Sequence, residues 1–276
     1  MKQFILKNEP VDNTIRLEGD DYRYLVRVRR IAVGEFFPAL LPNGAETLIH
    51  VFSISRGVLT GKCLANAGKE EILSKTVPPE TQMPPIILFQ AMPKGEKMDL
   101  IVRQAAEGGI TEIVPFVSEF SVAKEKTGGQ KYSRWERIIK EARQQSGSKT
   151  ATSIRLSASE RCMTKNEVLD YWKEQKDAGA IGLLFHQPIG NQGLEQNSLH
   201  GYLDSIPQTV VLAIGPEGGF SDNEVSLFLE KGFKLLTIGD TVLRTETAAL
   251  YCAAAVRILL LERNSWELKQ AKTGSG

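Results

Sequence analysis

The chain has 276 residues, 42% of them hydrophobic and 24% charged, which is the composition of an ordinary folded protein with one large domain or two unequal ones. Its 34 lysine and arginine residues balance 33 aspartates and glutamates, so the net charge of +1 does not by itself indicate a nucleic-acid partner. Local clusters of cations can still bind one.

Cysteine spacing and the length of the apolar runs argue against a disulfide-bonded, metal-binding or membrane protein. Cys63, Cys162 and Cys252 lie far apart and form no C-x-x-C pair, so they indicate neither a disulfide framework nor a metal site. The longest apolar run, 248–261, contains Arg257 and is shorter than the ~20 residues that a membrane helix needs. We therefore expect a cytoplasmic protein that binds no metal ion and does not enter a membrane.

The first 75 residues contain short, strand-like apolar runs. Examples are 47–55 and 57–65, which are separated by turn-forming residues. This pattern predicts a small β-rich domain over residues 1–75. Four prolines between residues 76 and 85 then disfavour a helix and predict an extended linker or a domain edge.

Strand and helix patterns alternate over residues 76–276. The strand-like runs cover 85–92, 111–117, 180–187, 209–215 and 233–239. The helical patterns cover 96–109, 133–147, 166–177, 222–232 and 245–264. Because the strands are continuously apolar and helices separate them, we expect an α/β domain with a mostly parallel sheet covered on both faces.

The stretch "LAIGPEGGFSDNEV", residues 212–225, places three glycines after a buried strand. Ser221 and Glu224 form a capping-box pattern that predicts the start of a helix. Ligands of open α/β sheets bind at the carboxyl ends of strands, so this loop is a candidate ligand site. The alternative is a tight turn that needs glycine only for a positive φ angle.

A second loop of this kind lies in "LLTIGDTVLRTETAAL", residues 235–250. Two such loops at neighbouring strand ends are expected to line one pocket. The glycine patterns of dinucleotide dehydrogenases, P-loop NTPases and serine hydrolases are absent, which disfavours those three classes.

Together the two stretches resemble the paired carboxy-terminal motifs of the SPOUT methyltransferases. The segments 21–35, 91–124 and 135–147 are similar to one SPOUT subfamily, RsmE, which methylates N3 of a uridine in small-subunit ribosomal RNA. The resemblance implies a trefoil-knot α/β methyltransferase domain over residues 76–276, preceded by a PUA-like β-barrel that binds RNA. It also implies S-adenosylmethionine as the cofactor, and a homodimer, which the apolar run 248–261 favours independently.

The resemblance also implies which residues form the site. Cofactor contacts are expected at Leu212, Ile214, Gly215, Gly218, Gly219, Ile238, Gly239, Leu243, Thr247 and Ala248. Arg244 is the candidate for stabilising the uracil imide anion or clamping a phosphate. Glu217 and Glu246 are the candidate proton acceptors. In the alternative reading these two carboxylates order the loops, with Arg244 pairing one of them.

Cationic residues are the candidate RNA contacts. They are Arg23, Arg27, Arg29, Arg30, Lys94, Arg134, Arg137 and Lys149. The alternative for each cluster is a solvated charged face. Family members usually carry arginine where this chain has Phe120 and Ser148, so contacts to the RNA are expected to differ there.

Three other functions stay open on the sequence alone. One is ribose 2′-O methylation of RNA. Another is a non-catalytic protein that binds RNA or assists ribosome assembly. The third is an enzyme that uses a different nucleotide-like cofactor. The partner expected from the resemblance is small-subunit ribosomal RNA or the assembled 30S subunit.

Overall fold

The structure is a computed structural model, and it divides the chain into two compact units. It describes residues 4–64, 83–122, 129–187, 198–237, 239 and 241–273. One unit combines Met1–Glu80 with Arg143–Ala151, and the other combines Thr81–Ala142 with Thr152–Gly276. The boundary proposed at residue 75 lies outside the described residues.

Segment 143–151 belongs to the first unit, whereas the predicted domain boundary placed it in the second. Lys149 forms an ion pair with Glu46, whose carboxylate lies 3.5 Å from its Nζ atom. The Lys149 carbonyl also packs so closely on Gly44 that no Cβ would fit there. These are contacts between residues more than 100 positions apart, which local sequence patterns do not report.

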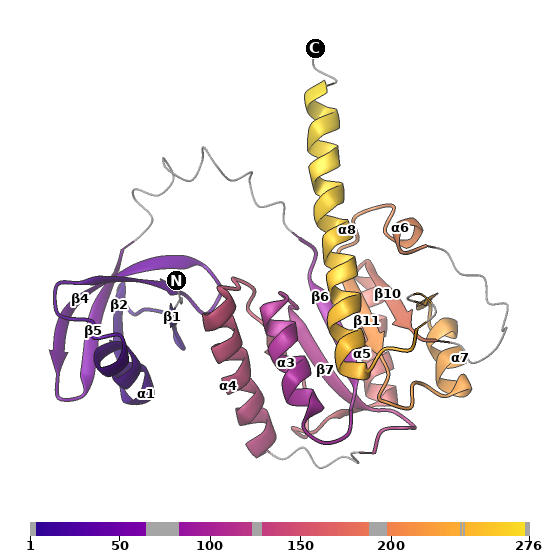
Figure 1. Cartoon of the computed structure of the whole chain (residues 1–276), viewed down its shortest axis with the longest axis horizontal. Coiled ribbons are helices and arrows are strands. Elements are labelled where there is room, and N and C mark those ends of the chain that lie inside the picture. Colours follow the sequence, from indigo (N-terminus) through magenta and orange to yellow (C-terminus); the bar gives the residue numbers. More distant parts are fainter. Residues whose placement is uncertain are drawn as a thin grey trace. The chain divides into compact units, whose positions relative to one another are not determined.

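The first unit is a curled, half-barrel sheet (Figure 1), which confirms the predicted β-rich unit. Its strands are β1 (Phe4–Ile5), β2 (Thr14–Leu17), β3 (Phe36–Leu40), β4 (Glu46–Ser55) and β5 (Val58–Leu64), and its helices are α1 (Gly19–Tyr22) and the π-helix η1 (Arg23–Val28). The strand order is β1-β3-β4-β5-β2, with β1 parallel to β3 and the other pairs antiparallel. Alternate strand residues, such as Ile49 and Val51, face a buried core.

The second unit contains a seven-stranded sheet in which every pair is parallel, as the continuous apolar runs predict. Its strands are β6 (Ile86–Ala91), β7 (Glu112–Val117), β8 (Ser153–Ile154), β9 (Met163–Thr164), β10 (Ala180–Phe185), β11 (Thr209–Ile214) and β12 (Lys234–Leu236). Its helices are α3 (Lys97–Glu107), α4 (Gly129–Ser146, whose last residues belong to the first unit), α5 (Lys165–Asp177), α6 (Leu199–Tyr202), α7 (Asp222–Glu230) and α8 (Thr245–Thr273). The strand order is β12-β10-β11-β6-β7-β8, and β9 extends the pairing of β7.

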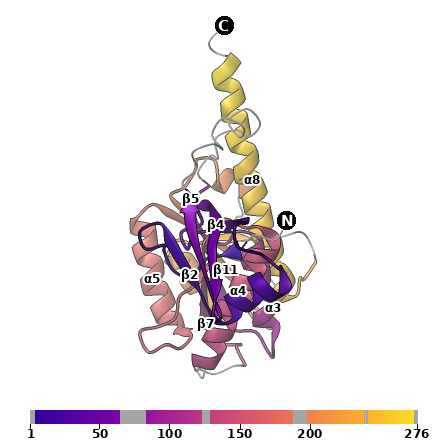
Figure 2. The same ribbon diagram turned by 90° about the vertical axis from the view of Figure 1, so that its left-hand side faces the viewer.

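Helices cover both faces of this sheet. Leu88 and Leu212 point to the face covered by α3, α4 and α8, whereas Phe89 and Val211 point to the face covered by α5 and α7. Figure 2 shows α5 on one side of the strands and α3 and α8 on the other. The period of two along each strand therefore produces two separate cores.

The order of the strands brings several loops to one edge. The last residue of β11, Ile214, pairs with Phe185 of β10 and Gln90 of β6. Parallel strands end at the same edge, so the loops after β6, β10, β11 and β12 gather there. Among the described helices, none is long and apolar enough to cross a membrane.

Candidate functional site

A cavity of about 1120 Å³ lies at this edge of the sheet. Six of the predicted cofactor residues line it: Ile214, Gly215, Gly218, Gly219, Leu243 and Ala248. Gly239 and Thr247 are not among its lining residues, and Leu212 is fully buried within β11. Ile238 lies outside the described residues.

The three glycines of the first loop serve the loop itself. A Cβ at Gly215 would lie 3.0 Å from the backbone of Gly219, and Gly219 has a φ angle of +71°. A Cβ at Gly218 would lie 3.1 Å from the Cβ of Phe120. The loop therefore folds back on itself and packs against Phe120.

The helix that follows this loop starts as predicted. Ser221 is the N-cap of α7 and forms a capping box with Glu224. The structure adds a second role for Glu224, which is fully buried. Its Oε1 atom accepts a hydrogen bond from the backbone N–H of Glu119, at 2.9 Å. One carboxylate thus connects the start of α7 to the turn after β7.

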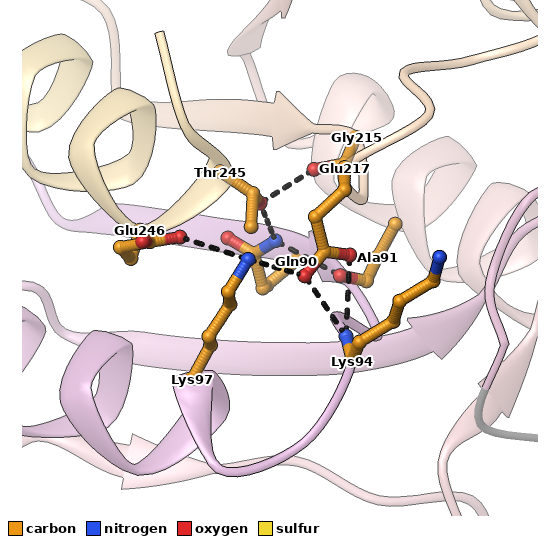
Figure 3. A network of polar contacts seen from close by, with 8 residues as sticks. All are labelled: Gln90, Ala91, Lys94, Lys97, Gly215, Glu217, Thr245 and Glu246. Atoms are coloured by element: carbon orange, nitrogen blue, oxygen red, sulfur yellow. Dashed lines mark hydrogen bonds and ion pairs between the residues drawn. The ribbon is translucent and has the colours of Figure 1, made fainter.

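The Thr245 hydroxyl joins the start of α8 to the first glycine-bearing loop, and a buried glutamine donates to that hydroxyl (Figure 3). Gln90, fully buried in β6, donates from Nε2 to Thr245 Oγ1 at 3.0 Å and to the carbonyl of Ala91 at 2.9 Å. Thr245 in turn donates to the carbonyl of Gly215, at 2.6 Å. The start of α8 is thereby held against the first loop. A glutamine inside the apolar run 85–92 was the only sign of this role in the sequence.

Lys97 forms the ionic link of the site (Figure 3). Its Nζ atom lies 2.7 Å from Glu217 Oε1 and 3.8 Å from Glu246 Oε2. The backbone N–H of Lys94 also donates to both Glu217 oxygens, at 3.1 and 3.2 Å. The hydrogen bond to Glu217 raises the pKa of Lys97. Lys97 was not predicted from the sequence, and it takes the loop-joining role that the alternative reading gave to Arg244.

The contacts of Glu217 lower its pKa. Partial burial acts to raise the pKa, but the hydrogen bonds from Lys97 and Lys94 outweigh it. A carboxylate with a lowered pKa is a weaker base. The environment of Glu217 therefore favours an ordering role over proton abstraction.

This lowered pKa leads to a prediction for stability against pH. The contribution of Glu217 is present above the ordinary value of 4.5 and is lost as the pH falls through the lower folded-state pKa. We expect Glu217→Gln to lower the free energy of unfolding at pH 7, and the difference from wild type to shrink toward pH 3. Urea unfolding at a series of pH values measures this. Glu230→Gln, at an exposed position, is the control, and a difference that does not change with pH would contradict the prediction.

Arg244 is exposed immediately before α8. Its carbonyl accepts the N–H of Ala248 at 2.7 Å, whereas no hydrogen bond or ion pair of its guanidinium is found among the described residues. The positive charge of Arg244 acts to lower the pKa of Lys97, because the two cations repel each other. Leu243 and Thr245, on either side of Arg244 in the sequence, line the cavity, whereas Arg244 itself is not among the lining residues.

His186 also lines the cavity, at the end of β10. Burial lowers the pKa of its imidazole, and this effect exceeds the opposing influence of the Asp222 carboxylate. The ring is therefore neutral at pH 7. Its backbone N–H donates to the carbonyl of Leu236 at 3.1 Å, which holds the ends of β10 and β12 together.

Comparison with known proteins identifies the family. The RNA methyltransferase domain family matches residues 79–257. The ribosomal RNA small subunit methyltransferase E of Aquifex aeolicus is 34% identical, over 81% of this chain and 86% of its own. This chain belongs to the RsmE family. The Synechocystis relative of the same name is 29% identical, over 91% of this chain and 75% of its own.

Solved structures confirm the fold. That of the ribosomal RNA small subunit methyltransferase E from Neisseria gonorrhoeae, bound to S-adenosyl methionine, has a TM-score of 0.73 and 25% identity, and covers 94% of this chain and 98% of its own. A probable rRNA-methyltransferase from Porphyromonas gingivalis, at 22% identity, has a TM-score of 0.75, with coverage of 95% and 99%. The predicted α/β fold of SPOUT, or trefoil-knot, methyltransferases is thereby confirmed.

The cationic candidates in the second unit of this RsmE family member differ in their ion pairs and exposure. Arg134 pairs with Asp99, Nη2 to Oδ2 at 2.5 Å, and the indole of Trp135 donates to the other Asp99 oxygen at 3.0 Å. Asp99 thus holds α4 on α3 and neutralises Arg134. Arg137 lies 3.9 Å from Glu141 on an exposed face, and the side chain of Lys94 is exposed.

Four cationic candidates of the first unit lie in η1 or directly after it. Arg23, Arg27 and Arg30 are exposed, and Arg23 pairs with Asp20 at 3.3 Å. Arg29 is half-buried. Exposed pairs of this kind contribute little stability, so these cations stay available to an anionic partner.

Proposed function

We propose that this protein transfers the methyl group of S-adenosylmethionine to N3 of a uridine in small-subunit ribosomal RNA. One observation supports the proposal most directly. Two loops at the carboxyl end of the sheet line a large cavity, and the exposed Arg244 lies in the second of them. Membership of the RsmE family supplies the reaction class.

The residues of the cavity fit the cofactor. Aliphatic side chains of Ile214, Leu236 and Leu243 line one part and suit the faces of adenine. Carboxylates of Glu217 and Asp222 line another part and suit the positively charged sulfonium and ammonium groups. The volume of about 1120 Å³ is sufficient for a nucleoside cofactor together with a base.

The chain must align uracil N3 with the methyl group and stabilise charge on the base. When bound, S-adenosylmethionine supplies an electrophilic methyl group on a positively charged sulfur. The Arg244 guanidinium, which stays protonated, stabilises the negative charge that remains on the imide once N3 loses its proton. The two loops fix the relative position of the reacting groups, since Thr245 and Lys97 tie them together.

Of the two predicted proton acceptors, Glu246 is the one whose contacts favour that role. Its Oε2 atom is buried and has no hydrogen-bond partner among the described residues, and the ion pair with Lys97 is long at 3.8 Å. Glu217, by contrast, is occupied by Lys97 and the backbone of Lys94. In this proposal the Glu246 carboxylate would accept the N3 proton, and S-adenosylmethionine, when bound, would supply the methyl group that takes its place.

Mass spectrometry of ribosomal RNA tests the proposed function. A strain that lacks this protein should lose one N3-methyluridine from its small-subunit RNA, and a plasmid copy should restore it. Loss of a ribose methyl group would instead support 2′-O methylation, and no loss would support a non-catalytic role. Transfer of labelled methyl to naked RNA and to assembled 30S subunits distinguishes the two candidate substrates. Cytoplasmic location is part of this proposal.

The proposal includes a homodimer formed through α8. The helix exposes Leu250, Tyr251, Ile258 and Leu261, and a smaller cavity of about 260 Å³ lies between it and α3. Exposed apolar surface on a helix is typical of an interface. A symmetric pair would cover this surface.

Sedimentation equilibrium measures the predicted dimer. Wild-type protein should have twice the chain mass of 30.5 kDa at micromolar concentration. Ile258→Glu, at a position 55% exposed, should shift it to the monomer, because a charge would be buried in an apolar interface. Val33→Glu, at a position 56% exposed in the first unit, is the control and should stay dimeric. A wild-type monomer would refute the dimer.

A further inference from the structure

Phe120 is an exposed aromatic residue on the lining of the main cavity. It lies in the turn after β7 and is 46% exposed. Single exposed apolar side chains are common on protein surfaces. The position of Phe120 distinguishes it, because the same ring that is open to solvent also borders the candidate site.

The backbone on both sides of Phe120 is fixed. The N–H of Glu119 donates to the buried Glu224, and Ser221 Oγ donates to a Glu119 carboxylate oxygen at 2.6 Å. The N–H of Ser118 donates to Ser121 Oγ at 3.1 Å, and the N–H of Ser121 donates to the carbonyl of Ser118 at 3.1 Å. The turn is therefore anchored to the start of α7 and closed by its own hydrogen bonds.

The glycine-bearing loop supports one side of Phe120. The Cβ position of Gly218 is 3.1 Å from the Cβ of Phe120, so the two segments are in direct contact. The packing places the aromatic side chain beside the loop without burying it. Because the backbone of the turn is held on both sides, little backbone entropy is lost when a flat partner stacks on the half-exposed ring.

We propose that Phe120 is a stacking platform for a base of the RNA substrate at the mouth of the cavity. The inference rests on the proposed function, because it assigns the ring to that substrate. Single-stranded RNA is commonly recognised by stacking of unpaired bases on aromatic side chains. The ring has no charge and no hydrogen-bonding group, so its contribution is independent of salt and tolerant of base identity.

Substitutions at position 120 test the platform. Phe120→Ala and Phe120→Leu should raise the dissociation constant for a ribosomal RNA fragment about tenfold to a hundredfold, since both remove the ring. Phe120→Leu keeps apolar volume beside Gly218, which protects the fold. Phe120→Trp should retain RNA affinity. Val122→Ala, at a position 60% exposed near the same turn but outside the cavity lining, is the matched control and should bind like wild type.

Three measurements separate the possible outcomes. Fluorescence anisotropy gives RNA affinity, calorimetry with S-adenosylhomocysteine gives cofactor affinity, and steady-state kinetics separates KM for RNA from kcat. The inference predicts a raised KM with unchanged S-adenosylhomocysteine affinity. A parallel loss of S-adenosylhomocysteine affinity would show that the ring serves the cofactor and would overturn it, as would RNA affinity in Phe120→Leu equal to that of Val122→Ala.

Failure of the proposed function has a different signature. If wild-type protein binds RNA but transfers no methyl group, the methyltransferase proposal fails while the anisotropy series still decides the role of Phe120. If wild-type protein binds no RNA, both the methyltransferase proposal and the role of Phe120 are refuted. Circular dichroism of each variant confirms that the fold is retained.

Discussion

Arg244→Ala is expected to bind S-adenosylhomocysteine with wild-type affinity and to lose about a hundredfold to a thousandfold in kcat. The guanidinium is exposed and its side chain makes no hydrogen bond or ion pair among the described residues, so its removal leaves the loops joined by Lys97. An interaction that forms mainly in the transition state lowers the rate without weakening cofactor binding. Single-turnover methyl transfer and calorimetry measure the two quantities.

Two further variants sharpen the test of Arg244. Arg244→Lys should restore little activity, because an ammonium lacks the planar fork of a guanidinium. Lys97→Met should instead weaken cofactor binding, since it removes the hydrogen bond that links α3 to Glu217 of the first loop. Near wild-type turnover by Arg244→Ala, or a variant that fails to fold, would show that Arg244 has no catalytic role.

Gly215→Val is expected to reduce cofactor affinity by up to about a hundredfold, because the loop would be forced out of its folded-back conformation. The atoms in the way are backbone atoms of Gly219, which would lie 3.0 Å from the new Cβ, and they can move only if the loop opens. The strands beneath are fully buried and should stay intact. Calorimetry with S-adenosylhomocysteine gives the affinity, and thermal unfolding monitors the fold.

Gly218→Ala is the matched control for Gly215→Val. Its Cβ would meet the side chain of Phe120 at a similar distance, 3.1 Å. Alanine adds one carbon where valine adds three, so the loss of cofactor affinity should be smaller. Equal affinities of Gly215→Val and wild type in folded protein would exclude the loop from the cofactor site.

Local signals in the sequence predicted the elements and the place of the site. The apolar runs predicted the parallel strands, and the Ser221 and Glu224 pair predicted the start of α7. Both signals depend on residues within a few positions of one another. The loop positions followed, because parallel strands all end at one edge.

The partners within the site were decided by tertiary structure. Gln90 meets Thr245 across 155 positions, and Lys97 meets Glu217 across 120. Nothing near Lys97 in the sequence distinguishes it from a surface lysine. It faces Glu217 because the register of β6 beside β11 brings the start of α3 next to the first loop.

Contacts of the charged residues and glycines were also decided by tertiary structure. Arg134 was predicted as an RNA contact from its basic helix, but its ion pair with Asp99 on another helix was not predicted. The contacts of Gly215 with the loop itself and of Gly218 with Phe120 were likewise not predicted from the sequence. Sequence by itself determined which segments form strands and helices, since those depend on local periodicity and capping. Only the tertiary structure decided which side chains pair there, because pairing depends on distances set by strand order and register.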